Sequence, residues 1–174
     1  MFYNLEIVKI DENYCNYLRK YDNKVTYNYG EKKNRPYVGV LFNIENMEYF
    51  VPLSSPKEKH LKMKNNLDFF KIDNGKLGVI NFNNMIPVTS NNYTLVDFDK
   101  KNKSSSDIKY LLLLENQLSF LNANYFSVVT KAIKLYNLYV NNRLPKSIKD
   151  RCCNYSLLED KCNEYNTNKE LQEV

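Results

Sequence analysis

One stretch of the sequence joins an apolar segment to a basic one and organises the rest of the chain: Val51-Pro52-Leu53-Ser54-Ser55-Pro56-Lys57-Glu58-Lys59-His60-Leu61-Lys62-Met63. We expect a strand here, followed by a helix, because Ser55 is a favourable N-cap and Pro56 suits the first helical position. Glu58 lies three residues after that cap and completes a capping box. Lys57 breaks the pattern, since the first turn of a helix favours an anion. Free N–H groups, hydroxyls and a lysine together suit a phosphate, so the junction is also a candidate anion site.

The residues before this junction predict a β-hairpin that brings a further cation to it. Residues 37–42 and 49–53 are rich in β-branched and aromatic side chains, and Glu45-Asn46 provides a turn between them. Because the start of one hairpin strand lies opposite the end of the other, we expect Arg35 to lie close to Ser55. The preceding residues, 22–34, are polar and predict a loop. Its lysines and tyrosines suit RNA, although a solvated connection is the simpler explanation.

Further short strands and several helices are expected on both sides of the hairpin. The other predicted strands are 3–7, 69–72, 77–80, 85–88 and 93–98. Helices are predicted from Asp11, from Ser106, over 125–139 and from Asn154 to about 165. This order indicates an α+β fold, in which helices pack around a small, strongly bent antiparallel sheet or barrel. We treat residues 1–174 as a single domain, with 166–174 as a frayed polar tail.

The distribution of charge favours an anionic partner. The net charge is +5, although the high lysine content is also typical of an AT-rich genome. Residues 24–64 hold eight Lys and Arg against four Asp and Glu, and residues 104–149 hold six against two. Residues 150–174 hold three against six. A basic middle and an acidic end predict a sided surface of the kind that binds nucleic acid.

Several classes of protein do not fit the sequence. No apolar run approaches the roughly 20 residues that span a bilayer, and the first residues lack the pattern of a signal peptide, so we expect a cytoplasmic protein without a membrane partner. The four cysteines show no C-x-x-C spacing and are expected to be reduced. Neither a Walker loop nor a G-x-G-x-x-G or H-E-x-x-H motif occurs, and the carboxylates are scattered. We therefore expect no cofactor and no metal.

Cleavage of RNA without a metal ion remains chemically possible at the junction, because RNA carries its own nucleophile, the 2′-hydroxyl. Lys57 would stabilise charge on the phosphate, with Arg35 as a second cation and Ser54 and Ser55 as hydrogen-bond donors. His60 is the residue best suited to proton transfer near neutral pH, although a lone histidine on a basic helix is more often inert. The alternative is a non-catalytic RNA-binding module that sequesters a small RNA. Only the Lys57 junction favours the enzyme.

Four collinear blocks of the chain resemble the ToxN/AbiQ family, the endoribonuclease toxins of type III toxin–antitoxin systems. The blocks are Arg35-Pro36-Tyr37-Val38-Gly39-Val40, Val51-Pro52-Leu53-Ser54-Ser55-Pro56-Lys57 with His60, Leu77-Gly78-Val79-Ile80-Asn81 with Met85-Ile86-Pro87-Val88, and Cys153-Asn154-Tyr155-Ser156-Leu157-Leu158-Glu159-Asp160-Lys161. The matches cover roughly residues 1–165.

The resemblance implies a barrel-like fold similar to the MazF/Kid toxins and metal-independent, sequence-selective cleavage of RNA, often at A-rich sites, through a 2′,3′-cyclic phosphate. It implies two RNA partners: a structured repeat antitoxin that the toxin processes, and cellular or phage substrates. The antitoxin inhibits the toxin and assembles with it into a closed protein–RNA ring. A role in abortive infection against phage follows.

The resemblance and the basic segments together define two sets of candidate residues. The catalytic set is Lys57, Ser55, Ser54, Arg35, His60 and Tyr29. The RNA-binding set is Lys24, Tyr27, Lys32, Lys33, Lys59, Lys62 and Lys64. Tyr27 and Tyr29 both lie near the position of the family's loop tyrosine, and neither aligns with it without a gap.

Overall fold

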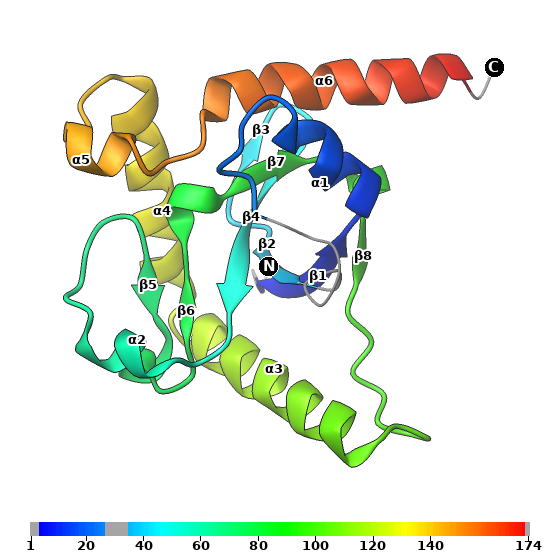
Figure 1. The fold of residues 1–174 in the computed structure, drawn as a ribbon, viewed down its shortest axis with the longest axis vertical. Coiled ribbons are helices and arrows are strands. Elements are labelled where there is room, and N and C mark those ends of the chain that lie inside the picture. The colour runs from blue at the N-terminus through cyan, green and yellow to red at the C-terminus, as the bar shows by residue number, and fades with distance from the viewer. Residues whose placement is uncertain (1–3, 27–34, 173–174) are drawn as a thin grey trace.

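The computed structural model describes residues 4–26 and 35–172, and an antiparallel sheet of eight strands lies at its centre (Figure 1). The strands are β1 (Glu6–Ile10), β2 (Pro36–Gly39), β3 (Asn43–Ile44), β4 (Met47–Ser54), β5 (Phe70–Lys71), β6 (Val79–Ile80), β7 (Ile86–Val88) and β8 (Tyr93–Leu95). The α-helices are α1 (Glu12–Arg19), α2 (Glu58–Lys62), α3 (Ser105–Ala123), α4 (Tyr125–Val140), α5 (Lys146–Lys149) and α6 (Tyr155–Gln172). The short 3-10 helices are η2 (Ile72–Gly75), η3 (Phe82–Asn84) and η4 (Ser90–Asn92).

Strand β4 is the centre of the sheet, because it pairs with four other strands. The main strand order is β5-β6-β4-β2-β1-β8, and β3 and β7 also pair with β4. Strand β7 pairs with the first half of β4, and β6 pairs with its last two residues, Leu53 and Ser54. The expected α+β fold is confirmed. The sheet is bent but not closed into a barrel, since the described strands β5 and β8 do not pair with each other.

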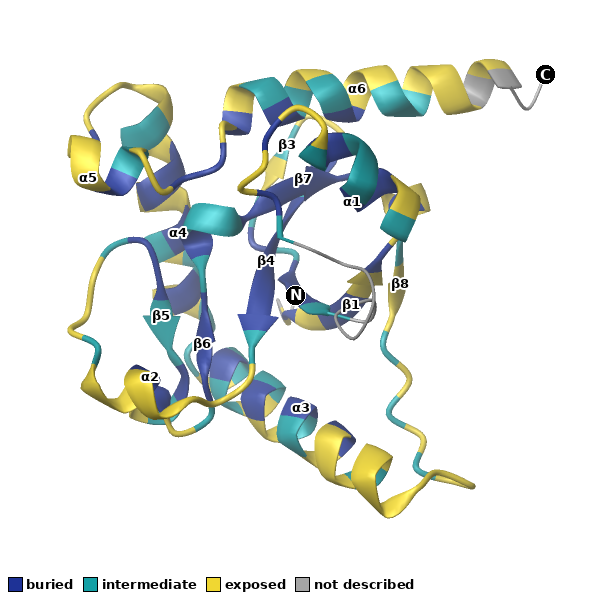
Figure 2. Ribbon diagram, in the orientation of Figure 1, coloured by how far each residue is buried: buried dark blue, intermediate teal, exposed yellow. Residues whose placement is uncertain are grey.

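The buried side chains lie mainly along β4 and on the helix faces turned toward the sheet. Six of the eight residues of β4 are buried, because strands pair with both of its edges and its Tyr49 ring packs against tyrosines of α4 and α6. In Figure 2 β4 and β7 are dark blue, whereas the first turns of α3 are yellow. The later turns of α3 contribute Leu114 and Leu121 to the core, and α4 contributes Val128 and Leu135. Burial of this apolar surface is the main favourable contribution to folding.

Two of the predicted helix starts are confirmed and one is moved. Asp11 caps α1, since its carboxylate accepts a hydrogen bond from the Tyr14 amide at 2.9 Å. Asn154 precedes α6, and its Oδ1 accepts a hydrogen bond from the Leu157 amide at 3.3 Å. Ser106 was expected to cap α3, but the cap is Ser104, whose Oγ accepts from the Asp107 amide at 3.1 Å. A serine two residues earlier therefore begins that helix.

The segment expected to be a frayed tail is helical as far as Gln172. Asn166 explains why α6 continues, because its Oδ1 accepts hydrogen bonds from Thr89 and Asn92, each at 2.8 Å. These contacts tie the helix to the chain between β7 and β8. Among the described residues, no helix combines the length and the apolar character needed to cross a membrane. All four cysteines are buried and none of them forms a disulfide.

A candidate active site at the end of β4

The junction between β4 and α2 leaves the sheet beside the β5–β6 pair (Figure 1). The last residue of β4, Ser54, pairs with Val79 of β6. Its Oγ accepts a hydrogen bond from Asn81 Nδ2 at 3.2 Å, so the hydroxyl proton of Ser54 is left to donate elsewhere. Gln117 of α3 lies behind this corner and donates to Leu77 O at 2.6 Å. Strand β4, the adjacent β5–β6 pair and helix α3 therefore fix the position of Ser54 together.

Gly78, directly before β6, allows the β5–β6 connection to approach the β4–α2 junction closely. It has a φ of +101°, and a Cβ at this position would lie 2.1 Å from the Ser54 carbonyl oxygen and 3.2 Å from the Pro56 nitrogen. A side chain therefore does not fit without moving the backbone of residues 54–56. The left-handed backbone adds a second reason for glycine at this position.

Helix α2 begins two residues later than the sequence suggests. Its N-cap is Lys57, with extended φ and ψ of −139° and 149°, and not Ser55. The reason is His60, whose Nδ1 accepts a hydrogen bond from the Lys57 amide at 3.2 Å while its own amide donates to the Lys57 carbonyl at 2.9 Å. His60 thus occupies the third position after the N-cap, which the predicted capping box assigned to Glu58. Ser55 is exposed, and no hydrogen bond of its hydroxyl occurs among the described residues.

His60 is the most buried of the described candidate residues, with only 2% of its surface exposed. Burial lowers the pKa of its imidazole, and the charges of Lys59, Lys57 and Lys71 lower it further. The neutral form is therefore favoured, and because Nδ1 is an acceptor its proton lies on Nε2. The Lys57 side chain, by contrast, is exposed. The observed contact places the imidazole behind the lysine backbone, and a catalytic role for His60 stays a prediction.

Arg35 lies directly before β2 and is brought to the same corner by strand pairing. In the register of β2 and β4, Tyr37 is opposite Pro52 and Val38 is opposite Val51. Continuing that register by two residues places Arg35 opposite Ser54. The expected neighbour of Arg35 was Ser55, whereas the register places Ser54 opposite it, nineteen positions away in the sequence.

The predicted RNA-binding lysines fall into two groups. Lys59, Lys62 and Lys64 are exposed on or just after α2, and Lys62 forms an ion pair with Glu58 at 3.0 Å. Lys24 lies elsewhere and donates to the Cys152 carbonyl at 2.9 Å, near the start of α6. The remaining candidates lie outside the described residues, and they are Tyr27, Tyr29, Lys32 and Lys33.

A cavity of about 350 Å³ adjoins the α2 side of the junction. The lining residues are Pro56, Lys57, Glu58 and Leu61 together with Gly75 and Lys76 of the β5–β6 connection. The cavity thus exposes two lysines, one glutamate and an apolar surface next to the serines. No cluster of His, Cys, Asp and Glu large enough to hold a metal ion occurs in the described part of the chain.

Three residues that shape this corner were not identified as candidates from the sequence: Gly78, Asn81 and Gln117. Two of them carry a local signal. Glycine occurs at only four positions in the chain, so each one is a candidate for a special backbone conformation. Gln117 is a polar residue on the buried face of α3, together with Leu111, Leu114 and Leu121. A buried amide needs partners, which here are the carbonyls next to the site.

The sequence and the fold both match known proteins. The family model described as "Toxin ToxN, type III toxin-antitoxin system" matches residues 6–163. Endoribonuclease ToxN of Bacillus thuringiensis subsp. kurstaki is 36% identical over 168 residues, which cover 94% of this chain and 86% of the relative. Endoribonuclease AbiQ of Lactococcus lactis subsp. lactis is 27% identical over 178 residues, covering 97% and 93%.

A solved structure from work on type III toxin inhibition by a non-coding RNA pseudoknot superposes with a TM-score of 0.78 at 34% identity, and covers 94% of this chain and 99% of that one. The family model spans most of the chain, and sequence and structure agree over nearly the same length. This chain therefore belongs to the ToxN family of type III toxin–antitoxin toxins.

Proposed function

We propose that this protein cleaves RNA at the end of β4 without a metal ion, by attack of the 2′-hydroxyl on the adjacent phosphate. That it is an endoribonuclease follows from its family, since its curated relatives are named endoribonucleases. The proposal concerns the site and the chemistry. It rests mainly on one observation: the side chains of Ser54, Ser55 and Lys57 present unused donors at one corner. Contacts with Asn81, Gly78 and His60 hold that corner in place.

In the proposed reaction the 2′-oxygen forms a bond to phosphorus and the bond from phosphorus to the 5′-oxygen breaks. The products are a 2′,3′-cyclic phosphate and a free 5′-hydroxyl, and the 2′-proton is lost while the leaving oxygen gains one. Lys57 and Arg35 neutralise the charge that accumulates on the phosphate oxygens. The Ser54 and Ser55 hydroxyls donate hydrogen bonds to the same oxygens. Tyr29, outside the described residues, is the remaining predicted catalytic group.

His60 acts through Lys57 as a positioning residue. Its Nδ1 holds the Lys57 amide, and this bond keeps the N-cap backbone extended so that the lysine side chain leaves the corner toward solvent. A neutral imidazole is required for that contact, and the lowered pKa of His60 keeps it neutral at physiological pH. The lysines of α2 then hold the flanking phosphates of the RNA strand.

The proposed partners follow from the relatives. One solved relative belongs to work on toxin inhibition by a non-coding RNA pseudoknot, and another to an antiviral system regulated by a processed non-coding RNA. We propose that a repeat RNA antitoxin inhibits this chain, is processed by it and assembles with it into a closed ring in the cytoplasm. A-rich phage and cellular RNAs are the proposed substrates, and abortive infection is the proposed outcome.

One experiment separates cleavage from simple RNA sequestration. Purified protein is incubated with an A-rich transcript in excess EDTA, and the product ends are analysed by mass spectrometry. We expect cleavage to 2′,3′-cyclic phosphate ends, and none with Lys57→Ala. Intact RNA with a shift in gel mobility would instead support a non-catalytic RNA-binding module. Cleavage that stops in EDTA would overturn the metal-independent mechanism.

A further inference from the structure

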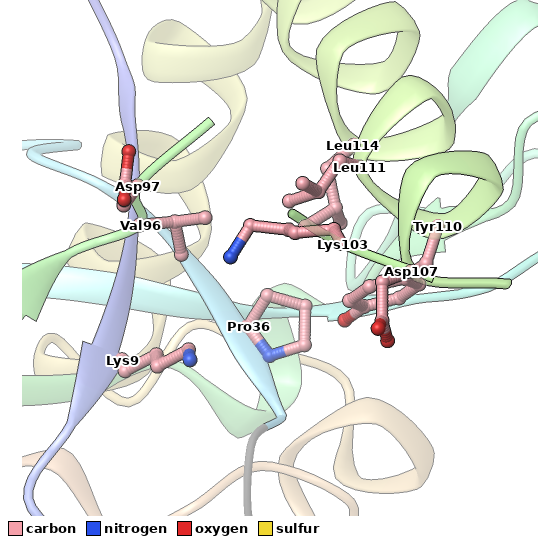
Figure 3. A pocket seen from close by; sticks show the side chains of 9 residues that line it. All are labelled: Lys9, Pro36, Val96, Asp97, Lys103, Asp107, Tyr110, Leu111 and Leu114. Atoms are coloured by element: carbon pink, nitrogen blue, oxygen red, sulfur yellow. The ribbon is translucent and has the colours of Figure 1, made fainter. Parts of the chain in front are cut away.

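A second cavity, of about 380 Å³, lies between the sheet and the first half of α3 (Figure 3). It is lined by the end of β1, the start of β2, the chain after β8 and the first half of α3. The lining residues are Lys9, Pro36, Val96, Asp97, Lys103, Asp107, Tyr110, Leu111 and Leu114. The proposed reaction uses none of them. The volume is within the range of pockets that hold small ligands.

Two elements that line this cavity also reach the candidate site. Pro36 in its floor directly follows Arg35, which the strand register places opposite Ser54. Leu114 in its wall lies one helical turn before Gln117, which donates to the Leu77 carbonyl behind the same serine. This arrangement suggests where a nucleotide next to a phosphate at Ser54 and Lys57 would bind.

The lining suits a nucleobase better than a phosphate or a purely apolar ligand. Pro36, Val96 and two leucines of α3 offer an apolar surface for the face of a base. Tyr110 is 41% exposed, and its ring offers a stacking partner. Figure 3 shows the Lys103 side chain extending across the cavity toward Val96, with Asp97 on one side and Asp107 on the other. Two lysines are balanced by two carboxylates, so the cavity carries no excess of positive charge for a phosphate alone.

The carboxylates indicate which bases fit. Ser104 donates to Asp107 Oδ2 at 2.6 Å and lowers the pKa of this carboxyl, which keeps it ionised and leaves Oδ1 as an acceptor. The Asp97 Oδ1 already accepts a hydrogen bond from the Asp99 amide at 2.9 Å, which fixes that side chain beside its own loop. Ionised carboxylates only accept hydrogen bonds, and exocyclic amino groups donate them. Adenine, cytosine and guanine have such a group, whereas uracil does not.

We infer that this cavity holds the base of a nucleotide next to the scissile phosphate and selects bases with an exocyclic amino group over uracil. This inference rests on the proposed function. Tyr110 stacks on the base, the Asp107 carboxylate accepts from its amino group, and Lys9 and Lys103 hold the adjoining phosphate. The cavity is thus a specificity site for the cleavage reaction, and Lys57 lies outside it.

The test uses short RNA substrates built around one mapped cleavage site. Adenine, cytosine, uracil or unsubstituted purine, which lacks the amino group, is placed in turn at each nucleotide flanking the cut. With the wild-type protein we expect the cleavage rate to fall about tenfold for uracil and for purine at one of the two positions. Asp107→Asn, whose amide also donates, is expected to abolish that difference and to accept uracil.

Stacking is tested separately. Tyr110→Ala is expected to slow cleavage of every substrate about tenfold, and Tyr110→Phe to restore the rate because it keeps the ring. Phe126→Ala is the matched aromatic control, since Phe126 is 81% exposed at the start of α4. Asp150→Asn is the matched carboxylate control, since Asp150 is exposed after α5. Thermal unfolding of each variant shows whether it is folded.

The outcomes distinguish the two proposals. If Tyr110→Ala and Asp107→Asn cleave every substrate like their controls, the cavity does not hold the base, and the reaction at Lys57 is unaffected. If the wild-type rate is the same for all four bases at both positions, base selection by this cavity is wrong. If the wild-type protein leaves every substrate intact in EDTA while Lys57→Ala behaves identically, the proposed function itself fails, and the inference fails with it.

Discussion

The two ends of β4 differ in how their polar groups are used. At the start of the strand, the hydroxyls of Tyr49 and of Tyr136 on α4 both donate to Glu159 Oε1 of α6, at 2.6 and 2.7 Å. At its end, Ser54 retains a donor, and the exposed side chains of Ser55 and Lys57 form no hydrogen bond or ion pair within the described part of the chain. Saturated polar groups join elements of the fold, whereas unused donors remain available for a substrate. The contrast predicts that substitutions at the two ends have opposite effects on stability and activity.

Lys57→Ala should produce the largest loss of activity. Removal of the cation from the phosphate is expected to lower the cleavage rate by about 10³-fold, with an unchanged unfolding temperature. The measurements are the rate on an A-rich RNA and growth arrest in cells. Lys146→Ala, at an exposed position of α5, is the matched control. Full toxicity of the Lys57 variant would place the active site elsewhere.

Gly78→Ala should come next, because its Cβ would be 2.1 Å from the Ser54 carbonyl oxygen. The junction must move, and we expect about 10²-fold slower cleavage, since misplaced catalytic groups lose rate steeply. Gly39→Ala is the comparison at a core position, where the Cβ would be 2.4 Å from the Phe50 ring. That variant should lose stability in urea unfolding and keep its rate per folded molecule. The same loss of activity in both variants would contradict a local effect at the site.

His60→Ala should have a smaller effect, up to about tenfold, because it removes one hydrogen bond to the Lys57 amide. His60→Gln should restore most of the rate, since its side-chain oxygen can accept the same bond. The wild-type rate should fall in acid, because protonation of Nδ1 breaks the contact, while the Gln variant shows no such fall. A rate that remains low in the Gln variant at neutral pH would instead indicate direct proton transfer by the imidazole.

The same histidine predicts how stability depends on pH. Its pKa is lowered in the folded protein, so the unfolded chain binds more protons below the ordinary value near 6.5. The contribution is fully present above that value and is lost as the pH falls through the lowered folded pKa. Urea unfolding of the wild-type and Gln variants between pH 5 and pH 8 measures it. Parallel pH curves would contradict the assignment.

Glu159→Ala should leave the cleavage rate per folded molecule unchanged and lower the free energy of unfolding by about 2 to 4 kcal/mol, because two tyrosine hydroxyls lose their acceptor. Asp160→Ala, the exposed neighbour, is the control and should change stability little. A large drop in the rate per folded molecule would mean that the two ends of β4 are coupled.

Much of this could be predicted from local pattern. The pairing of residues 37–38 with 51–52 follows from strand propensity and a short turn, although the register places Arg35 opposite Ser54 and not Ser55, and the antiparallel α+β fold is confirmed. The start of α2 could not be predicted, because Glu58 matches the capping-box pattern while the bond that decides the matter comes from His60. The pairing of β4 with four other strands could not be predicted either, since it depends on contacts between distant segments. The need for glycine at position 78 is visible only in the structure, where the backbone of residues 54–56 lies against it.

The open edges of the sheet have a consequence for self-association. Its outermost strands, β5 and β8, contain only two and three residues. Such short edges offer few unpaired backbone groups to the sheet of another molecule, which limits edge-to-edge aggregation. Through these two described edges, copies of this protein therefore have little means of joining into continuous β-structure. In the proposed ring, RNA would provide the connections between protein molecules, and the assembly would come apart when the RNA is digested.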